Sequence, residues 1–153
     1  MSNHDSARLL AEKLCNQAYV IMTNYFPLVQ YLIAKGHDEI IVPGGQYQKN
    51  NAMLCHPSES VNNFYCADHM FVCADGITEQ GAFQSDVFSG MCERQMVSVS
   101  TRITVILQKN AINHAVGSKI ANLDAIHSVL VCEDVEQRVL DELKARNIKV
   151  IRV

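Results

Sequence analysis

The sequence predicts an α/β domain with a mostly parallel, open sheet and helices on both faces. Two observations support this prediction. Short apolar runs, each followed by small or polar residues, recur along the chain, and segments with helical periodicity lie between them. Strands that are buried on both faces form such apolar runs, and a helix between two strands returns the chain for parallel pairing.

The first part of the chain predicts a helix, a strand and a second helix. Leucines recur at helical spacing over 5–14, and Asp5 or Ser6 can cap the start of that helix. The apolar run 19–22 predicts a strand. The segment 25–34 predicts the second helix, because a proline stands in its first turn and a glycine follows its end.

The middle of the chain predicts three buried strands and one helix. The strands are the apolar runs 39–42, 70–73 and 103–107, each followed by a loop. Apolar side chains at helical spacing predict a helix over 86–99 that packs on the sheet. The segment 46–59 has no regular pattern, and we interpret it as a long loop that folds over a ligand.

The C-terminal part has the clearest alternation of patterns. It predicts a strand at 129–132, a helix at 134–146 with Asn147 as its C-cap, and a last strand at 148–153. Strands and helices that alternate in this way form a parallel sheet with its helices on the outside.

Length, composition and charge limit the possible functions. The chain has 153 residues, of which 48% are apolar, so it can bury one core, and we expect a single domain over 1–153. Its formal net charge of −3 opposes a nucleic-acid-binding surface, because such surfaces gain affinity when Lys and Arg release the counterions of phosphates. We therefore expect the chain to bind DNA poorly by itself.

The six cysteines form no CxxC pair and mostly lie in apolar runs. This pattern predicts reduced, buried thiols in a cytoplasmic protein. The sequence shows neither a signal-peptide pattern nor an apolar run of about 18 residues, the length that a membrane span needs. We expect a soluble protein with no membrane partner.

Small and polar residues stand at four places where a predicted strand ends or a helix begins. They are Ser6, Thr23 and Asn24, Gly44 and Gly45, and Asp75 and Gly76. In open parallel sheets, ligands bind beyond the carboxyl ends of the strands, where the N-termini of helices attract anions. Each loop by itself is more simply a helix cap or a turn. Their recurrence at successive strand ends favours a site for a phosphorylated small molecule.

Metal binding and catalysis have weaker support in the sequence. Cys55, His56, Cys66 and His69 are candidate zinc ligands, but the neighbours Cys55 and His56 cannot easily converge on one ion, so we expect no metal and no cofactor. Nucleophilic catalysis needs a thiol or hydroxyl paired with a base, and no local pattern indicates such a pairing of a Cys or Ser with a His, so we assign no catalytic residue. Glu93 is interpreted as part of a solvated helix face.

Three segments in order resemble the sensor domain of the DeoR family of bacterial sugar-operon repressors. They are Met22-Thr23-Asn24-Tyr25-Phe26-Pro27-Leu28, Gly44-Gly45-Gln46-Tyr47 and Ala74-Asp75-Gly76-Ile77-Thr78-Glu79-Gln80-Gly81. Within the family, the first two segments and the closing Ile-x-Arg-Val are most similar to the branch that represses L-ascorbate utilisation. The resemblance implies the fold of ribose-5-phosphate isomerase and CoA transferases, and a phosphorylated sugar, such as L-ascorbate 6-phosphate, as the effector.

The chain departs from the family pattern at three places. Family members normally carry an N-terminal winged helix-turn-helix that reads operator DNA, and we expect that reader to be absent from this chain. We also expect the usual first strand of the sensor to be absent, and His4-Asp5-Ser6 to replace a Gly-Thr-Thr phosphate loop, so that Ser6 alone keeps a hydroxyl. After the strand that ends at Leu107, Lys109 stands about two positions from where the family has its ligand-facing lysine.

The sequence is thus interpreted as an effector-sensing domain without enzyme activity. The predicted ligand residues are Ser6, Thr23, Asn24, Gly44, Gly45, Asp75, Gly76 and Lys109. We expect a homo-oligomer in which the ligand favours one arrangement of the loop 46–59 or of the subunit interface, and so changes the spacing of attached DNA readers. Two alternatives remain open: a sugar-phosphate isomerase with Asp75 as its base, and a vestigial oligomerisation module.

Overall fold

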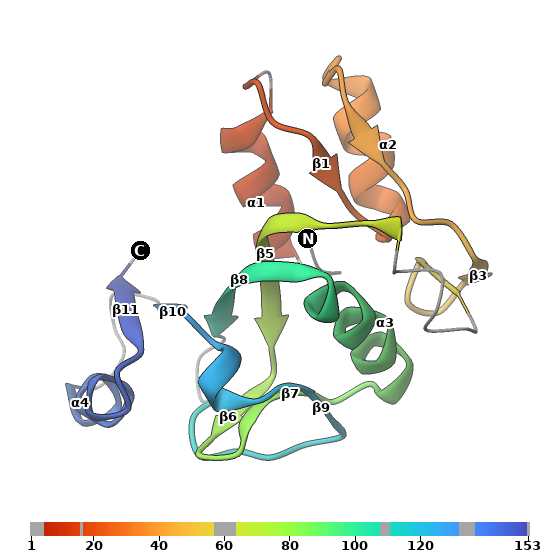
Figure 1. The fold of residues 1–153 in the computed structure, drawn as a ribbon. Helices are drawn as coiled ribbons and strands as arrows, with labels where there is room; N and C mark the ends of the chain where they lie inside the picture. Colours follow the sequence, from red (N-terminus) through yellow and green to blue (C-terminus); the bar gives the residue numbers. More distant parts are fainter. Residues whose placement is uncertain (1–4, 16, 57–63, 108–110, 132–136, 153) are drawn as a thin grey trace.

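A parallel four-stranded sheet forms the centre of the molecule in a computed structural model that describes residues 5–15, 17–56, 64–107, 111–131 and 137–152 (Figure 1). Its strands are β5 (Ala67–Ala74), β8 (Ser100–Leu107), β10 (Ser128–Val131) and β11 (Lys149–Arg152). They pair in the order β11-β10-β8-β5, and every pair is parallel. The predicted α/β class with a mostly parallel central sheet is therefore confirmed.

The main hydrophobic core lies on one face of this sheet. Alternate side chains of β5 and β8 enter it, because successive side chains of a strand point to opposite faces. Val72, Val105 and Val129, one from each of three neighbouring strands, are fully buried there. Two helices cover the face, α3 (Val87–Ser98) through Met96 and α4 (Gln137–Ala145) through Leu140 and Leu143. Both helices were predicted, and residues 134–136 of the expected C-terminal helix lie outside the described residues.

Helix α3 also buries polar side chains, and it packs against β9 (Ser118–Ala121). A Cβ atom at Gly90 would lie 2.1 Å from Ser118 Oγ, so the glycine allows the helix to approach this strand closely. Glu93 lies one turn further along and is 1% exposed, with Gln84 Nε2 donating to its carboxylate at 3.3 Å. The prediction that Glu93 is solvated is wrong, because periodicity could not reveal a second packing surface on α3.

The N-terminal part forms a separate layered unit of two helices and two short strands. Its elements are α1 (Asp5–Leu14), β1 (Ile21–Met22), α2 (Phe26–Ala34) and β2 (Ile40–Ile41). β1 and β2 pair in parallel, and the helices bury their own apolar cluster with β1, which includes Ala11, Leu28 and Leu32. The predicted strand over 19–22 is shorter than expected, since Tyr19 and Val20 are exposed and precede β1.

Two antiparallel units were not predicted. One is a hairpin of β3 (Gln46–Gln48) and β4 (Met53–Cys55), which falls inside the segment 46–59 that we expected to be irregular. The other is a sheet of β6 (Gly76–Thr78), β7 (Gly81–Gln84) and β9. These strands have three or four residues each, too few for the alternation of polar and apolar residues to be recognised.

The C-terminal elements agree with the sequence patterns. A short 3-10 helix, η2 (Leu123–Ala125), leads into β10, and Asn147 adopts a positive φ of 59° between α4 and β11, as expected of a C-cap. None of the helices in the described ranges combines the length and apolarity of a transmembrane span.

Candidate functional site

The segment Thr23–Asn24 leaves the end of β1 and is held on two sides. The Thr23 N–H donates to the carbonyl of Ile41 at 3.0 Å, and the Asn24 carbonyl accepts the N–H of Leu54 at 2.9 Å. Both side chains are buried, and Thr23 Oγ1 accepts the N–H of Tyr25 at 3.2 Å. The segment is thus clamped between β2 and β4, which is the position that the sequence predicted for a ligand loop beyond a strand end.

Gly44 and Gly45 follow β2 and have positive φ angles of 80° and 110°. A Cβ atom at Gly45 would lie 2.4 Å from the carbonyl carbon of Cys55, so only glycine allows this loop to lie directly against β4. A Cβ atom at Gly44 would have no neighbour within 4 Å. At Gly44 the position that a side chain would take is therefore open space, whereas Gly45 supports the loop.

The loops 23–24 and 44–45 meet at β4, and we call these two loops together with β4 the β4 junction. The hairpin is fixed to α3 by side chains that the sequence analysis did not identify. Asn51 Nδ2 donates to Ser89 Oγ at 2.7 Å and also to the Asp86 carboxylate, and Gln95 Nε2 donates to the His56 carbonyl at 3.1 Å. The Lys-Asn-Asn run at 49–51 between two apolar-containing segments is a turn signal that could have indicated the hairpin.

A disulfide between Cys55 and Cys92 joins β4 to α3, with the two Cα atoms 5.6 Å apart. The expectation that all six cysteines are reduced is therefore wrong for this pair, and Cys66 is exposed rather than buried. The pairing could not be read from the sequence, because the two residues are 37 positions apart and only the docking of the hairpin on α3 brings them together. Cys55 is consequently no zinc ligand.

Asp86 caps the N-terminus of α3 and sets its electrostatics. Its carboxylate accepts the backbone N–H of Ser89 at 2.7 Å. This bond is the main reason that the pKa of Asp86 is lowered, and hydrogen bonds from the Ser89 and Asn51 side chains and the Phe88 N–H add to the effect. Because a carboxylate already occupies this helix end, the start of α3 is a poor place for an anionic ligand.

Asp75 and Gly76 lie at the end of β5, where they contact elements other than the β4 junction. The Asp75 carboxylate accepts the backbone N–H of Ser85 at 3.0 Å and also the Ser85 hydroxyl. A Cβ atom at Gly76 would lie 1.9 Å from the carbonyl oxygen of His114. In this structure both residues hold neighbouring segments in place, which is the structural role that turn residues usually have.

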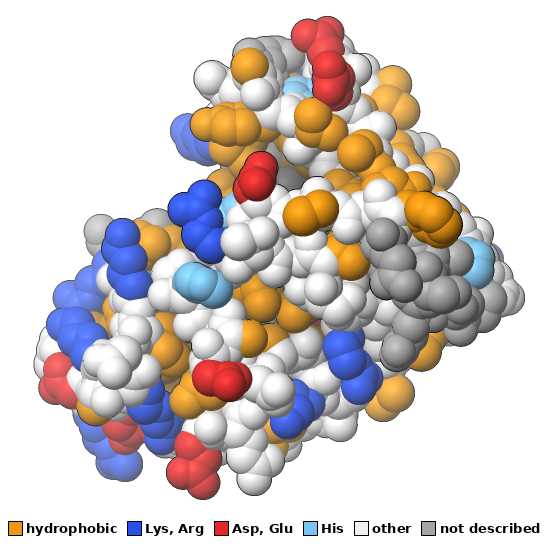
Figure 2. All heavy atoms as spheres, in the orientation of Figure 1, with side chains coloured by type: hydrophobic (Ala, Val, Ile, Leu, Met, Phe, Trp, Pro, Cys, Tyr) orange, Lys and Arg blue, Asp and Glu red, His pale blue; other side chains and the backbone are white. Residues whose placement is uncertain are grey.

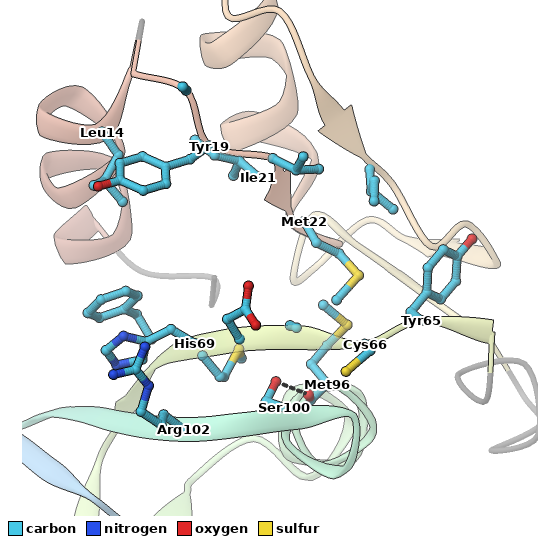
Figure 3. A pocket seen from close by; sticks show the side chains of 17 residues that line it. Leu14, Tyr19, Ile21, Met22, Tyr65, Cys66, His69, Met96, Ser100 and Arg102 are labelled. Carbon is cyan, nitrogen blue, oxygen red and sulfur yellow. Dashed lines mark hydrogen bonds between the residues drawn. The ribbon is translucent and has the colours of Figure 1, made fainter.

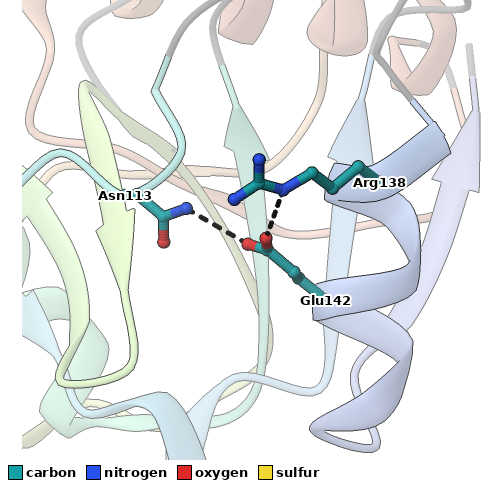
Figure 4. A network of polar contacts seen from close by, with 3 residues as sticks. All are labelled: Asn113, Arg138 and Glu142. Atoms are coloured by element: carbon teal, nitrogen blue, oxygen red, sulfur yellow. Dashed lines mark hydrogen bonds and ion pairs between the residues drawn. The ribbon is translucent and has the colours of Figure 1, made fainter.

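The loop that follows β8 is anchored beside Gly76. Ile77 N–H donates to the Ala111 carbonyl at 2.7 Å, and Asn113 N–H donates to the Ile77 carbonyl at 2.8 Å. The Asn113 side chain then donates to Glu142 of α4, which also pairs with Arg138 (Figure 4). These two bonds, that of Asn113 first, lower the pKa of Glu142. Lys109 belongs to the same loop but lies outside the described residues.

Ser6 lies in the first turn of α1 and is partly buried. Its neighbour Ala7 packs in the apolar cluster of the N-terminal unit. The structure therefore brings Thr23, Asn24, Gly44 and Gly45 together at the β4 junction, and it places Ser6, Asp75 and Gly76 in other local surroundings.

A groove of about 820 Å³ lies elsewhere on the surface, between β1 and β5 (Figure 3). Met22, Met70 and Met96 line it, and His69 and Arg102 lie at one end. His69 stacks on Phe71 and bonds Thr104 Oγ1 at 2.7 Å. Burial, followed by the charges of Arg102 and His127, lowers the pKa of His69. No residue of the predicted ligand set lines this groove among those described.

Comparison with known proteins identifies the family of the chain. The family model of the DeoR C terminal sensor domain matches residues 5–132. Similar proteins include the HTH-type transcriptional regulators UlaR of Escherichia coli (strain K12 / DH10B) and of Shigella boydii serotype 18, each 31% identical over 148 residues. The aligned region covers 97% of this chain and 59% of each relative, so the chain spans less than two thirds of the regulators it matches. The chain belongs to the DeoR family of transcriptional regulators, as a C-terminal sensor domain.

Proposed function

We propose that this domain binds a phosphorylated sugar and thereby controls the DNA binding of a transcriptional repressor. The observation that carries the proposal is the β4 junction, where two loops of small and polar residues meet beyond the ends of parallel strands. Sites for phosphorylated ligands in open parallel sheets have this location and this kind of residue. Membership in a family of sensor domains supplies the regulatory role.

We propose that different polar groups of the domain contact the phosphate and the hydroxyl groups of the ligand. The backbone of Gly44, which has open space where a side chain would be, and the Ser6 hydroxyl are suited to phosphate oxygens. The Asn24 amide is suited to sugar hydroxyls. Thr23 and Gly45 shape the loops. Asp75, Gly76 and Lys109 complete the proposed set, with the Asp75 carboxylate toward a hydroxyl, since two anions would repel each other.

In the proposed mechanism, DNA binding is controlled through a homo-oligomer that carries a separate DNA-binding domain. The hairpin β3–β4 and α3 are joined by Asn51 and by the Cys55–Cys92 disulfide, so a shift of the hairpin on ligand binding would move α3 with it. A ligand that prefers one of two such arrangements shifts their populations and thereby the spacing of the attached readers.

Sensing is favoured over catalysis by the surroundings of Asp75, the one residue suited to proton transfer in an isomerase. Its carboxylate accepts two hydrogen bonds from Ser85, which engage it in holding the turn before α3. We further propose that the domain shares the fold of ribose-5-phosphate isomerase without its reaction. Turnover of a bound sugar phosphate would contradict this part of the proposal.

A thermal-shift series with phosphorylated sugars tests the function. At a concentration about 100 times its dissociation constant, a ligand adds about 2.7 kcal/mol of stability, which corresponds to roughly 5–10 °C for a domain of this size. We expect such a shift with one sugar phosphate, L-ascorbate 6-phosphate being the first to test because of the resemblance to the ascorbate branch. The unphosphorylated sugar at the same concentration is the control.

Variants show where a ligand that raises the melting temperature binds. We expect Asn24→Ser and Gly44→Ala to weaken binding at least tenfold, while Asp124→Ala, an exposed residue of η2, leaves it unchanged. If the shift survives both substitutions, the β4 junction is not the binding site. If no sugar phosphate raises the melting temperature, the vestigial oligomerisation module is the better account of the domain.

A further inference from the structure

Cys55 of the Cys55–Cys92 disulfide belongs to the strand on which both loops of the β4 junction rest. The Gly45 loop lies directly against the carbonyl group of Cys55, and the neighbouring Leu54 N–H donates to the Asn24 carbonyl at 2.9 Å. Cys92 is fully buried on α3, so the bond ties this strand to the helix. A covalent link behind the β4 junction therefore supports both of its loops.

An acceptor for a thiol stands beside the disulfide. Gln95 Oε1 lies 3.7 Å from Cys55 Sγ, and the Gln95 side chain is buried. A disulfide sulfur has no proton to donate, whereas a thiol donates one weakly. The amide is held in this position because Gln95 Nε2 donates to the His56 carbonyl at 3.1 Å. The surroundings thus suit the reduced pair as well as the oxidised pair.

The hairpin β3–β4 is a small unit that can separate from α3. Its strands have three residues each. In the described ranges, the buried apolar cluster that joins it to the helix consists of Met53, Cys55 and Cys92, with Tyr25 and Phe88 packed against it. Hydrophobic side chains also reach the surface along the side of the molecule that holds the hairpin and α3 (Figure 2). Because local opening is easiest where few apolar contacts are buried, opening of the hairpin gives small thiols access to the disulfide.

A disulfide is unusual in a protein that regulates transcription. The chain belongs to a family of transcriptional regulators, which act in the compartment that holds the DNA. Glutathione and thioredoxin keep thiols reduced there, and the disulfides that do occur are usually transient or redox-sensing. A reversible bond is therefore the expected kind at this position.

We propose that Cys55 and Cys92 form a reversible redox switch that fixes or releases the β4 junction. In the oxidised state the disulfide holds β4 on α3, and both loops are preorganised for a ligand. In the reduced state two separate sulfurs need more space than a bonded pair, so β4 moves away from α3 and the loops lose their support. The consequence for sensing rests on the proposed function: reduction lowers the affinity for a sugar phosphate.

The chemical step is an exchange with a small thiol such as glutathione. One thiolate attacks a sulfur of the disulfide, forms a mixed disulfide, and releases the other cysteine as a thiolate that takes up a proton. A second thiolate attacks the reagent's sulfur in the mixed disulfide, releases the remaining cysteine and forms the disulfide of the reagent. Two reagent thiols are thereby oxidised and two cysteines are reduced, with two electrons transferred in total. Exchange with the disulfide of the reagent reverses the step.

Titration of the intact chain in glutathione buffers tests the switch without any ligand. The ratio of reduced to oxidised glutathione is varied, free thiols are trapped by alkylation, and the state of Cys55 and Cys92 is measured by mass spectrometry. We expect both cysteines to change state together, over the same range of ratios from either starting state. Hydrogen exchange of the Leu54 amide, which binds the Asn24 loop, should become at least tenfold faster in the reduced protein.

Calorimetry with L-ascorbate 6-phosphate as the probe tests the consequence for sensing. We expect at least tenfold weaker binding to the reduced wild type, and to a Cys55→Ser/Cys92→Ser variant in either buffer. Cys66→Ser removes an exposed free thiol and keeps the pair, so this control should respond to reduction as the wild type does. Ligand and redox state are linked reciprocally. A tenfold preference for the oxidised form therefore lowers the reduction potential of the pair by about 30 mV at saturating probe.

Three results would overturn the proposal. Cys55 and Cys92 could stay oxidised in every buffer in which the chain is folded, which would make the bond a permanent cross-link. They could stay reduced in every buffer. Reduction could leave the exchange of the Leu54 amide unchanged, which would show that the bond does not support the junction. If the titration and the exchange behave as expected but no sugar phosphate binds in either state, the redox switch stands and the sugar-phosphate proposal fails.

Discussion

The two adjacent glycines of the β4 junction have different tasks. Gly45 lies against the backbone of Cys55 and His56, and Gly44 borders open space, although both have positive φ angles. We expect Gly45→Ala to destabilise the fold by about 3 kcal/mol or more, because a methyl group would collide with backbone that cannot move aside. Gly44→Ala should cost only about 1–2 kcal/mol, the strain of a positive φ.

Urea denaturation of the two variants measures this difference. If both variants lose the same stability, the loop does not lie against β4 as described. Ligand affinity should not follow this order of stability. Gly44→Ala should weaken ligand binding strongly although it costs little stability, because Gly44 is the position proposed to approach the phosphate.

Asp86 stabilises α3 through its cap. Replacing it by alanine removes the bond to the Ser89 N–H and the contact with Asn51, and should lower the free energy of unfolding by about 1–2 kcal/mol. Asparagine caps helices about as well as aspartate, so Asp86→Asn is the matched control and should lose much less. Thermal unfolding at neutral pH measures both. Equal losses in the two variants would contradict the capping role.

Acid should weaken the same cap. The hydrogen bond from the Ser89 N–H, the largest of the causes, lowers the pKa of Asp86 in the folded state. The contribution of the carboxylate is therefore complete above about pH 4, the ordinary pKa of aspartate, and is lost as the pH falls through the lowered value. We expect the stability difference between the wild type and Asp86→Asn to shrink in this range, as measured by urea denaturation between pH 5 and pH 2.

At the scale of elements, the hairpin β3–β4 and α3 behave as one piece because a disulfide joins them. The cross-link spans 37 residues, and a loop of that length corresponds to about 3–4 kcal/mol. Reductant should therefore lower the melting temperature of the wild type, and it should have no such effect on a Cys55→Ala/Cys92→Ala variant. Cys66→Ser, at an exposed free thiol, is the control that keeps the response.

Chemical labelling gives an independent measurement. Alkylation of the unfolded, non-reduced protein should leave Cys55 and Cys92 unlabelled, and prior reduction should make both reactive. Labelling of these two residues without reduction would show that the pair is not oxidised in solution.

At the scale of the whole molecule, two of the apolar clusters lie on either side of the groove between β1 and β5. The main cluster spans β5, β8, β10, α3 and α4, whereas the N-terminal unit buries only a small cluster around Leu32. Because local opening follows the number of buried apolar contacts, we expect faster hydrogen exchange in β1 and α2 than in β8 and β10. Uniform protection of both regions would indicate one cooperative unit.

Several elements were predictable because local patterns determine them. The periodicity of apolar residues predicted α1, α3 and α4, and a proline in the first turn with a glycine after the end predicted α2, where Gly36 has a φ of 71°. The four strands of the main sheet were predicted because buried parallel strands need continuous apolar runs. The short strands β3, β4, β6, β7 and β9 escaped prediction, since their pairing depends on turns and on neighbours distant in the sequence.

The candidate site was predictable only in its loops. Thr23, Asn24, Gly44 and Gly45 were recognised as strand-end residues, and the structure brings them together. Asn51, Asp86 and the partners Cys55 and Cys92 were missed as contributors, because their contacts join segments more than 30 residues apart. Glu93 was predicted to be solvated because the apolar side chains of α3 indicate only one buried face. The polar side chains that α3 also buries do not contribute to apolar periodicity.

The sequence by itself determined the α/β class, the order of the main elements, the family and the loops that could meet a ligand, because these follow from side-chain periodicity and local motifs. Tertiary structure decided which loops meet, which cysteines pair and where the surface is hollowed. Those features arise from the packing of one element on another, and the free energy of such contacts depends on distances in space that a linear pattern does not contain.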